Sequence, residues 1–247
     1  MPKKSRLDQE LVTRGAFSSR EQAQRAIMAG EIKIGTRVAS KASELVEPTA
    51  EITAAAPPKY VGRGGLKLEG ALDHFQIDVA GKIALDIGAS TGGFTDCLLQ
   101  RGVAKVYAVD VGHDQLAWKI RNDPRVSVLE KVNARFLSNE QIPEPVDICV
   151  IDVSFISLTL ILSNAFDLIT PNGVIVALIK PQFELQKKDV SRGGVVRDAE
   201  LHEKAKGTIV DFVTMNLQQQ VVGIIPSPVT GTDGNQEFFV CLRKRLD

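Results

Sequence analysis

The chain has 247 residues with 30 Lys or Arg against 30 Asp or Glu, so its formal net charge is zero, and 44% of it is hydrophobic. A chain of this size and composition can bury a full core. The N-terminus MPKKSRLDQE lacks the apolar segment of a signal peptide, and polar residues interrupt the densest apolar stretch, 148–169, which excludes a membrane span. Cys97, Cys149 and Cys241 lie far apart, which excludes a disulfide framework or a cysteine metal site. We therefore expect a cytoplasmic protein with buried thiols and no bound metal.

The first 41 residues are the basic end of the chain, with nine Lys or Arg against four Asp or Glu. RLDQELVTRG predicts a short helix, SSREQAQRAIMAG predicts a second helix capped by Ser18 or Ser19, and EIKIGTRV predicts two strands around Gly35 and Thr36. This charge favours contact with nucleic-acid phosphates, and a merely solvated basic face is the alternative. Because Phe17 is the only aromatic residue before residue 48, we expect recognition of RNA backbone and shape rather than base stacking.

A break in the pattern follows at EPTAEITAAAPPK, residues 47–59. After it, apolar strands alternate with helices, which predicts an α/β fold with a mostly parallel sheet covered on both faces. The last two strands lie too close together for a crossover helix, so the final strand is expected to run antiparallel to its neighbour. The expected strands begin near residues 82, 105, 126, 147, 173, 219 and 237, and the clearest helices are 93–101, 114–121, 157–169 and 198–216.

A glycine-rich loop follows the first of these strands, in LDIGASTGGFTDCLL, where Gly88, Gly92 and Gly93 let a ligand approach the backbone. The spacing is not the GxGxxG pattern and no phosphate-loop lysine follows, so phosphate binding is disfavoured, while a tight turn without a ligand stays possible. Asp110 ends the second strand, where a carboxylate can accept both hydroxyls of a ribose. Together with Asp86 it makes an acidic pocket without a nearby arginine, which favours S-adenosylmethionine over NADP.

Four further charged residues are expected at the ends of elements: Lys67, Asp152, Lys180 and Glu237. Asp152 lies inside the apolar run CVIDVSFISL and needs a partner, because an isolated buried charge is costly. Methyl transfer to a hydroxyl requires an acceptor oxygen that is held in line and relieved of its proton. Lys180 could act as a neutral base or as a cation that stabilises the developing alkoxide, and the sequence leaves both roles open. The simpler alternative is that these are solvated lysines and edge charges.

The order Lys67, Asp152, Lys180, Glu237 matches the Lys-Asp-Lys-Glu tetrad of FtsJ-like ribose 2′-O-methyltransferases, which this chain resembles. More narrowly, YVGRGGLKL, DIGASTGGFTDCLL, DVSFISL, KPQFE, GGVVRD and GNQEFF resemble the TlyA, or hemolysin A, family of ribosomal RNA methyltransferases. The resemblance spans nearly the whole chain and implies a Rossmann-like methyltransferase domain with a seven-stranded sheet and S-adenosylmethionine as the cofactor. Gly62 departs from the family pattern, which usually has serine before Arg-Gly-Gly.

The resemblance also implies the roles of individual residues and a substrate, the cytidine ribose of ribosomal RNA. The tetrad is implied to be catalytic, and Phe155 is implied to line the pocket near the methyl group. The few residues before the first helix resemble the shorter family form, which is associated with large-subunit RNA alone. The residues implied to surround the cofactor are Asp86, Gly88, Ala89, Ser90, Thr91, Gly92, Gly93, Phe94, Asp110, Asn133, Asp152 and Phe155.

Residues 6–46 resemble the small α+β RNA-binding fold first described in the fourth small-subunit ribosomal protein. We therefore expect an RNA-binding domain at 1–47, a linker at 48–62 and an FtsJ-like methyltransferase domain at 63–247. The small domain is expected to deliver ribosomal RNA or a ribosomal subunit to the larger one. The residues expected to contact RNA are Arg6, Arg14, Arg20, Arg25, Lys33, Arg37 and Arg63.

Three other functions compete with this interpretation. A small-molecule O-methyltransferase would use the front domain only for assembly. A non-catalytic RNA-binding or ribosome-assembly protein would have a vestigial pocket, and the intact glycines and tetrad argue against it. Pore formation in membranes, which the family name hemolysin suggests, is disfavoured because neither a spanning segment nor a strongly amphipathic cationic helix is evident.

Overall fold

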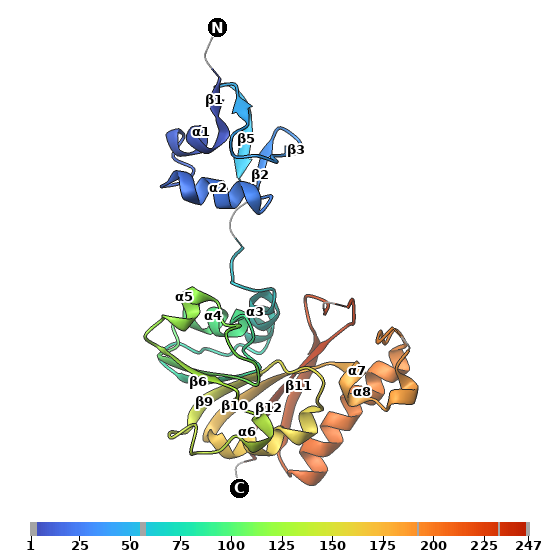
Figure 1. Cartoon of the computed structure of the whole chain (residues 1–247). Helices are drawn as coiled ribbons and strands as arrows, with labels where there is room; N and C mark the ends of the chain where they lie inside the picture. Colours follow the sequence, from blue (N-terminus) through green and yellow to red (C-terminus); the bar gives the residue numbers. More distant parts are fainter. Residues whose placement is uncertain (1–3, 55–57, 192, 232, 246–247) are drawn as a thin grey trace. The chain divides into compact units, whose positions relative to one another are not determined.

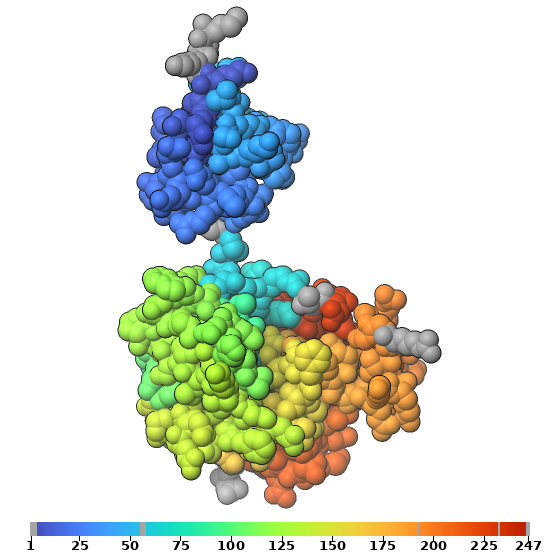
Figure 2. All heavy atoms as spheres, viewed as in Figure 1, coloured from blue at the N-terminus to red at the C-terminus, as the bar shows by residue number. Residues whose placement is uncertain are grey.

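The computed structural model describes residues 4–54, 58–191, 193–231 and 233–245. The chain divides into two compact units, residues 1–58 and 59–247 (Figures 1 and 2). Part of the expected linker, 48–62, folds with the first unit, because a strand at Ile52–Ala54 pairs with Ile32–Ile34. Residues 55–57 of that linker lie outside the described residues.

The first unit is a small α+β fold, as the sequence predicts. Helix α2 begins after Ser19, whose hydroxyl accepts a hydrogen bond from the backbone N–H of Gln22 at 3.3 Å, which confirms an expected N-cap. The hairpin of β2 and β3 is also present, and β5 adds to it. The pairing of β1 with β4 was not predicted, because two-residue strands have no periodic signal. The elements are β1 (Ser5–Arg6), α1 (Leu7–Thr13), α2 (Arg20–Met28), β2 (Ile32–Ile34), β3 (Arg37–Val38), β4 (Leu45–Val46) and β5 (Ile52–Ala54).

The second unit is built on a seven-stranded sheet in the order β11-β12-β10-β9-β6-β7-β8 (Figure 1). Strands β10, β9, β6, β7 and β8 are parallel, whereas β12 runs antiparallel to both β10 and β11. All seven predicted strands and the antiparallel final strand are therefore confirmed. The strands are β6 (Ile83–Ile87), β7 (Lys105–Asp110), β8 (Val126–Glu130), β9 (Val146–Ile151), β10 (Ile169–Ile179), β11 (Gln220–Pro226) and β12 (Phe238–Arg243).

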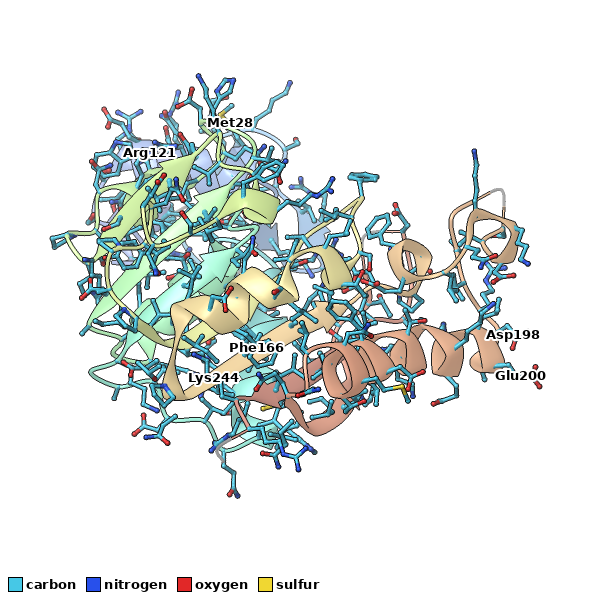
Figure 3. All side chains as sticks on the ribbon, turned by 90° about the horizontal axis from the view of Figure 1, so that it is seen from below. Met28, Arg121, Phe166, Asp198, Glu200 and Lys244 are labelled. Carbon is cyan, nitrogen blue, oxygen red and sulfur yellow. The ribbon has the colours of Figure 1, made fainter. Side chains whose placement is uncertain are left out.

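Helices cover both faces of this sheet, and their side chains meet alternate residues of each strand. Along β6, Ala84 belongs to the apolar cluster that includes residues of α3 and α4, whereas Leu85 belongs to the cluster that includes residues of α6 and α8. Asp198 caps α8, because its carboxylate accepts a hydrogen bond from the N–H of Glu200 at 2.8 Å. Both residues are labelled in Figure 3. The helices are α3 (Gly64–His74), α4 (Gly93–Gln100), α5 (Trp118–Arg121), α6 (Leu162–Leu168), α7 (Pro181–Glu184) and α8 (Ala199–Asp211).

The expected helices differ from these mainly at their ends. The helix expected at 114–121 is reduced to the four residues of α5, and the one expected at 157–169 begins with a separate 3₁₀ turn at Leu158–Leu160. The three cysteines are free and buried, as predicted. Burial raises the pKa of both Cys97 and Cys241 to about 11, so these thiols stay protonated and serve as core residues.

Candidate active site

The loop between β6 and α4 forms the floor of a cleft at the carboxyl edge of the parallel strands. Gly88 has a φ of +88°, and a Cβ at this position would lie 2.3 Å from the carbonyl oxygen of Asp152, so only glycine fits. The N–H of Gly88 donates to the carbonyl of Val109 at 2.8 Å, and the N–H of Asp152 donates to the carbonyl of Ile87 at 2.9 Å. These bonds fix the loop between the ends of β7 and β9.

Asp110, the last residue of β7, forms another wall of this cleft. Its Oδ2 accepts a hydrogen bond from the N–H of Ser90 at 2.8 Å, and its Oδ1 accepts one from the N–H of Gly112 at 2.7 Å. Each oxygen retains a lone pair, so the fixed carboxylate can also accept hydroxyl groups of a ligand. The cleft has a volume of about 440 Å³. The predicted cofactor residues that line it are Gly88, Ser90, Asp110, Asn133, Asp152 and Phe155.

Asp86 lies beneath the cleft, with none of its surface exposed, rather than on the lining. Its Oδ2 accepts a hydrogen bond from the hydroxyl of Thr95 at 2.6 Å, whereas its Oδ1 has no hydrogen-bond partner among the described residues. Burial, assisted by the nearby charge of Asp152, raises the pKa of Asp86 to about 7. Positive charge in the cleft would stabilise the ionised form of this carboxylate. The residues present therefore fit a cofactor that carries a ribose and a cationic group.

Lys67, Asp152, Lys180 and Glu237 meet in an adjoining cleft of about 380 Å³. The Nζ of Lys180 lies 2.6 Å from Oδ1 of Asp152, and the two form an ion pair whose geometry does not meet the angles of a hydrogen bond. The same Nζ donates a hydrogen bond to the hydroxyl of Ser154 at 2.9 Å. The Nζ of Lys67 donates to Oε2 of Glu237 at 2.5 Å, and the Glu237 side chain is only 3% exposed. The Asp152 carboxylate, which follows an apolar strand and is 20% exposed rather than fully buried, thus has a cationic partner.

The topology of the sheet brings these residues to one edge. Asp152 directly follows β9 and Lys180 directly follows β10, and the two strands are parallel. Glu237 directly precedes β12, and because this strand is antiparallel, its start lies at the same edge. Ile179 is paired with Phe238 in the register of β10 and β12, which places Lys180 and Glu237 side by side.

Lys67 reaches this edge from α3, whose first turn packs closely on the start of α4 at Gly93. A Cβ at Gly93 would lie 3.0 Å from the backbone nitrogen of Gly65, so a side chain there would force α3 away from α4, and Lys67 would leave the cleft with it. A Cβ at Gly65 would lie 2.2 Å from the ring of Tyr60, so this glycine makes room for the segment that precedes α3.

The rest of the glycine-rich loop is divided between the two clefts. The clefts share Gly88, Ser90 and Asp152, so they form one continuous site. Gly92 lines neither cleft, and a Cβ there would lie 2.9 Å from the side chain of Leu116, so this glycine serves close packing. The predicted cofactor residues in the second cleft are Gly88, Ala89, Ser90, Thr91, Gly93, Phe94 and Asp152.

Two polar residues that support the site were missed by the sequence analysis. Ser154 accepts the hydrogen bond of Lys180, and Glu184 accepts bonds from the hydroxyl of Ser157 at 2.5 Å and the N–H of Leu158 at 2.9 Å. Glu184 thereby ties the segment after β9 to the segment after β10, and burial raises the pKa of its carboxyl. Both residues lie in the motifs DVSFISL and KPQFE, but a contact between two distant motifs leaves no signal along the chain.

A buried carboxylate organises part of the basic surface of the first unit. Asp8 has no exposed surface, and it accepts two hydrogen bonds from Arg6, at 3.0 and 2.9 Å, one from Arg20 at 3.1 Å and one from Gln24 at 2.7 Å. The bonds from Arg6 hold the pKa of Asp8 well below its ordinary value, against the effect of burial. Arg6 and Arg20, both expected to contact RNA, therefore have a structural role.

The other residues expected to contact RNA fall into three groups. Arg14 and Arg37 each form an ion pair with a glutamate of the first unit. Arg25 and Lys33 are exposed and have no ion-pair partner within the described part of the chain. Arg63 belongs to the second unit and lines the cleft of the tetrad.

Across residues 4–54, 58–191, 193–231 and 233–245, no helix is long and apolar enough to cross a membrane.

Comparison with protein families agrees with this architecture. Residues 60–244 match the FtsJ-like methyltransferase family, and residues 5–52 match the S4 domain. With the seven-stranded sheet and the site at its carboxyl edge, these matches define a methyltransferase of the FtsJ-like class that carries an S4 domain.

Relatives narrow the class further. The 16S/23S rRNA (cytidine-2′-O)-methyltransferase TlyA of Mycobacterium tuberculosis is 45% identical over 249 residues, which cover 100% of this chain and 92% of the relative. Hemolysin A of Brachyspira hyodysenteriae is 44% identical, with 95% of this chain and 98% of the relative covered. The structure of a protein named as a hemolysin from Streptococcus thermophilus superposes with a TM-score of 0.75 at 41% identity, covering 99% of this chain and 90% of that one. The chain belongs to the TlyA family of FtsJ-like methyltransferases.

Proposed function

We propose that this protein transfers a methyl group from S-adenosylmethionine to the 2′-hydroxyl of a cytidine ribose in large-subunit ribosomal RNA. The observation that carries the proposal is the continuity of two clefts, one with the glycine-rich loop and Asp110, the other with two lysine–carboxylate pairs. The name of the relative TlyA, 16S/23S rRNA (cytidine-2′-O)-methyltransferase, supports a cytidine of ribosomal RNA as the acceptor. A ribosomal substrate would place the reaction in the cytoplasm.

The residues of the first cleft would hold the cofactor. Asp110 would accept the ribose hydroxyls, Asn133 would line the cofactor cleft, and Phe155 would lie near the methyl group, while the loop from Gly88 would allow close backbone approach. When bound, S-adenosylmethionine supplies a methyl group on a positively charged sulfonium. Asp152 on the lining and the buried Asp86 beneath it suit that charge.

The residues of the second cleft would act on the acceptor hydroxyl. Asp152 holds the Nζ of Lys180 at 2.6 Å, where the lysine can orient the acceptor oxygen and stabilise its developing negative charge. Lys67 and Glu237 form a second pair that fixes the opposite side of the cleft. A neutral Lys180 that removes the proton is the other possible role. A pH–rate profile distinguishes the two, because a basic lysine would make the rate rise with its deprotonation.

The S4 domain would bind the RNA. Arg25 and Lys33 are the informative residues for a test, since replacing Arg20 would also disturb Asp8. The double variant Arg25→Ala, Lys33→Ala should weaken RNA binding and lower the slope of log affinity against log salt by about two. Unchanged affinity would remove these two residues from the interface.

The decisive experiment is transfer of tritiated methyl groups from S-adenosylmethionine to isolated large and small ribosomal subunits and to free ribosomal RNA. Asp152→Ala serves as the inactive control. Label in large-subunit RNA that makes one dinucleotide resistant to alkali would establish 2′-O-methylation, because the modification removes the hydroxyl that attacks the phosphodiester. Label confined to the small subunit would show that the substrate is small-subunit RNA instead of large-subunit RNA. Cofactor binding without label in any RNA would refute the proposal in favour of another acceptor.

A further inference from the structure

Three carboxylates gather where the central parallel strands end, and Asp86 is the most deeply placed of them. In the register of the sheet, Asp86 is paired with Ala108 of β7 and with Val150 of β9. Asp110 and Asp152 each lie two residues beyond these partners, and residues two apart along a strand face the same side of the sheet. The rise along a strand and the spacing between strands therefore put Asp86 about 8 Å, Cα to Cα, from each of the other two.

The space between Asp110 and Asp152 belongs to the first cleft. Gly88 is at the same level of the segment that continues β6, and it has no side chain to fill that space. Gly88, Asp110 and Asp152 all line the cleft, and the described residues that line it include no lysine, arginine or histidine. A ligand that occupies the cleft therefore enters the field of three carboxylates.

Asp86 differs from the other two carboxylates in how its charge is compensated. Two backbone N–H groups donate to Asp110, and Lys180 is paired with Asp152. Asp86 has one oxygen that accepts the hydroxyl hydrogen of Thr95 and one that has no hydrogen-bond partner among the described residues. Burial, with the charges of Asp152 and Asp110 adding to its effect, raises the pKa of Asp86 to about 7. Asp86 can therefore change its protonation near neutral pH.

Other charged and titratable groups on the surrounding elements have partners or stay neutral. Lys67 of α3 donates to Glu237, and Asp96 of α4 forms an ion pair with Lys119 at 3.0 Å. Cys149 of β9 is fully buried, and burial raises the pKa of its thiol, so it remains uncharged. A cationic ligand in the cleft would give the buried carboxylate below it the compensation that these lysines give elsewhere.

We propose that Asp86 makes the cofactor cleft prefer the cationic methyl donor to its demethylated product, because it is ionised when a sulfonium is bound and protonated when a thioether is bound. The inference rests on the proposed function, since it takes S-adenosylmethionine as the donor. Transfer of the methyl group breaks the bond between carbon and sulfur, forms a bond between carbon and the acceptor oxygen, and releases the hydroxyl proton. The sulfur keeps the electron pair and becomes neutral, so the cleft loses one positive charge.

This role needs no contact between Asp86 and the ligand. The charges of Asp110 and Asp152 already act on Asp86 from the lining of the cleft, so a charge bound between them would act on it as well. With the sulfonium gone, Asp86 would take up a proton and the product would lose its electrostatic attraction to the site. Fresh donor could then displace the product.

The test is isothermal titration calorimetry of the full-length protein with S-adenosylmethionine and with S-adenosylhomocysteine. Titrations in two buffers of different ionisation enthalpy give the number of protons exchanged on binding. At pH 7 the donor should release about half a proton more than the product, because a group with a pKa of about 7 is half protonated there. The α-amino group of both ligands titrates in a similar range, so comparison with Asp86→Asn isolates the contribution of Asp86.

Affinities measured from about pH 5.5 to about pH 8.5 give the second readout. At the upper end Asp86→Asn should bind the donor about tenfold more weakly than the wild type, and at the lower end, where the wild-type carboxyl is protonated, equally well. The two proteins should bind the product alike. Asp167→Asn makes the same chemical change at an exposed position of α6 outside both clefts, and it should behave as the wild type.

Thr95→Val gives a variant that keeps the carboxyl. It removes the hydroxyl that stabilises the ionised form of Asp86, so it should raise the pH at which donor affinity increases. An unchanged midpoint would contradict the assignment, and this readout serves even if Asp86→Asn does not fold.

Three further results would overturn the inference while leaving the proposed function in place. The wild-type protein could release equal numbers of protons with both ligands, Asp86→Asn could keep the wild-type pH dependence, or Asp167→Asn could lose it to the same extent. By contrast, a wild-type protein that shows the expected proton release but methylates no ribosomal RNA would lose the proposed acceptor and keep this role of Asp86.

Discussion

The pair formed by Lys67 and Glu237 gives the sharpest test of how the site is held together. Its atoms are 2.5 Å apart and its side chains are 11% and 3% exposed, so each charge depends on the other for compensation. Replacing Glu237 with leucine would leave the ammonium of Lys67 buried without a partner. The loss of stability expected for a buried pair broken on one side is about 3–5 kcal/mol.

The double variant Lys67→Met, Glu237→Leu should recover most of that loss, because an apolar pair of similar volume often replaces a buried ion pair at little cost. Urea unfolding followed by circular dichroism for the wild type, both single variants and the double variant gives the coupling energy, which we expect to exceed about 2 kcal/mol. Methyl transfer should stay absent in the double variant, since restored packing does not restore the charges that face the acceptor.

Two results would refute this reasoning. If the stability losses of the single variants simply added in the double variant, the two charges would not compensate each other in the fold. If the double variant regained methyl transfer together with stability, the pair would serve only the structure and would have no role in the reaction.

Three further predictions concern carboxylates. Asp8→Ala should destabilise the first unit by roughly 2–4 kcal/mol at pH 7. Because folding lowers the pKa of Asp8, its contribution to stability is full above the unfolded pKa and is lost as the pH falls through the folded pKa. The stability of the variant, measured by urea unfolding, should therefore depend less on acid than that of the wild type. Asp86 has a folded pKa raised to about 7, so the folded state binds more protons and wild-type stability should decrease as the pH rises from about 4 towards 7. Asp86→Asn should flatten this slope, and equal slopes would contradict the raised pKa. Glu184→Ala should lower kcat about tenfold with little change in cofactor affinity. Glu184→Gln retains an acceptor for the N–H of Leu158, so its kcat should be close to that of the wild type. Equal losses of kcat in both variants would exclude a role through these hydrogen bonds.

The sheet could be predicted from the sequence because each strand is a short apolar run followed by a turn or a helix signal. The antiparallel last strand followed from the short connection before it, since a parallel arrangement needs a crossover. The helix ends were less well predicted, as at α5, because few residues there belong to a repeating apolar pattern. The pairing of β1 with β4 had no local signal at all.

The candidate site was predictable as a set of residues and not as a set of contacts. The sequence indicated that Asp152 needed a partner, but which residue provides it depends on strand order and direction, which place Lys180 at 2.6 Å. It could not show that Asp86 lies below the cleft, because a carboxylate in a strand can face either side of the sheet. Arg6 and Arg20 had the charge expected of RNA contacts, and only the fold reveals that both are bonded to Asp8.

The hydrogen bond between Lys67 and Glu237 joins positions 170 residues apart in the chain. During synthesis at ordinary rates, roughly 10–30 s therefore separate the emergence of the lysine from that of the glutamate. Strand β12 must also insert between β10 and β11 before the glutamate reaches the edge of the sheet. A growing polypeptide can thus expose the glycine-rich loop and the S4 domain well before it can react. The tetrad is therefore complete only after translation of this strand, so the order of synthesis itself delays assembly of the site until the chain is almost finished.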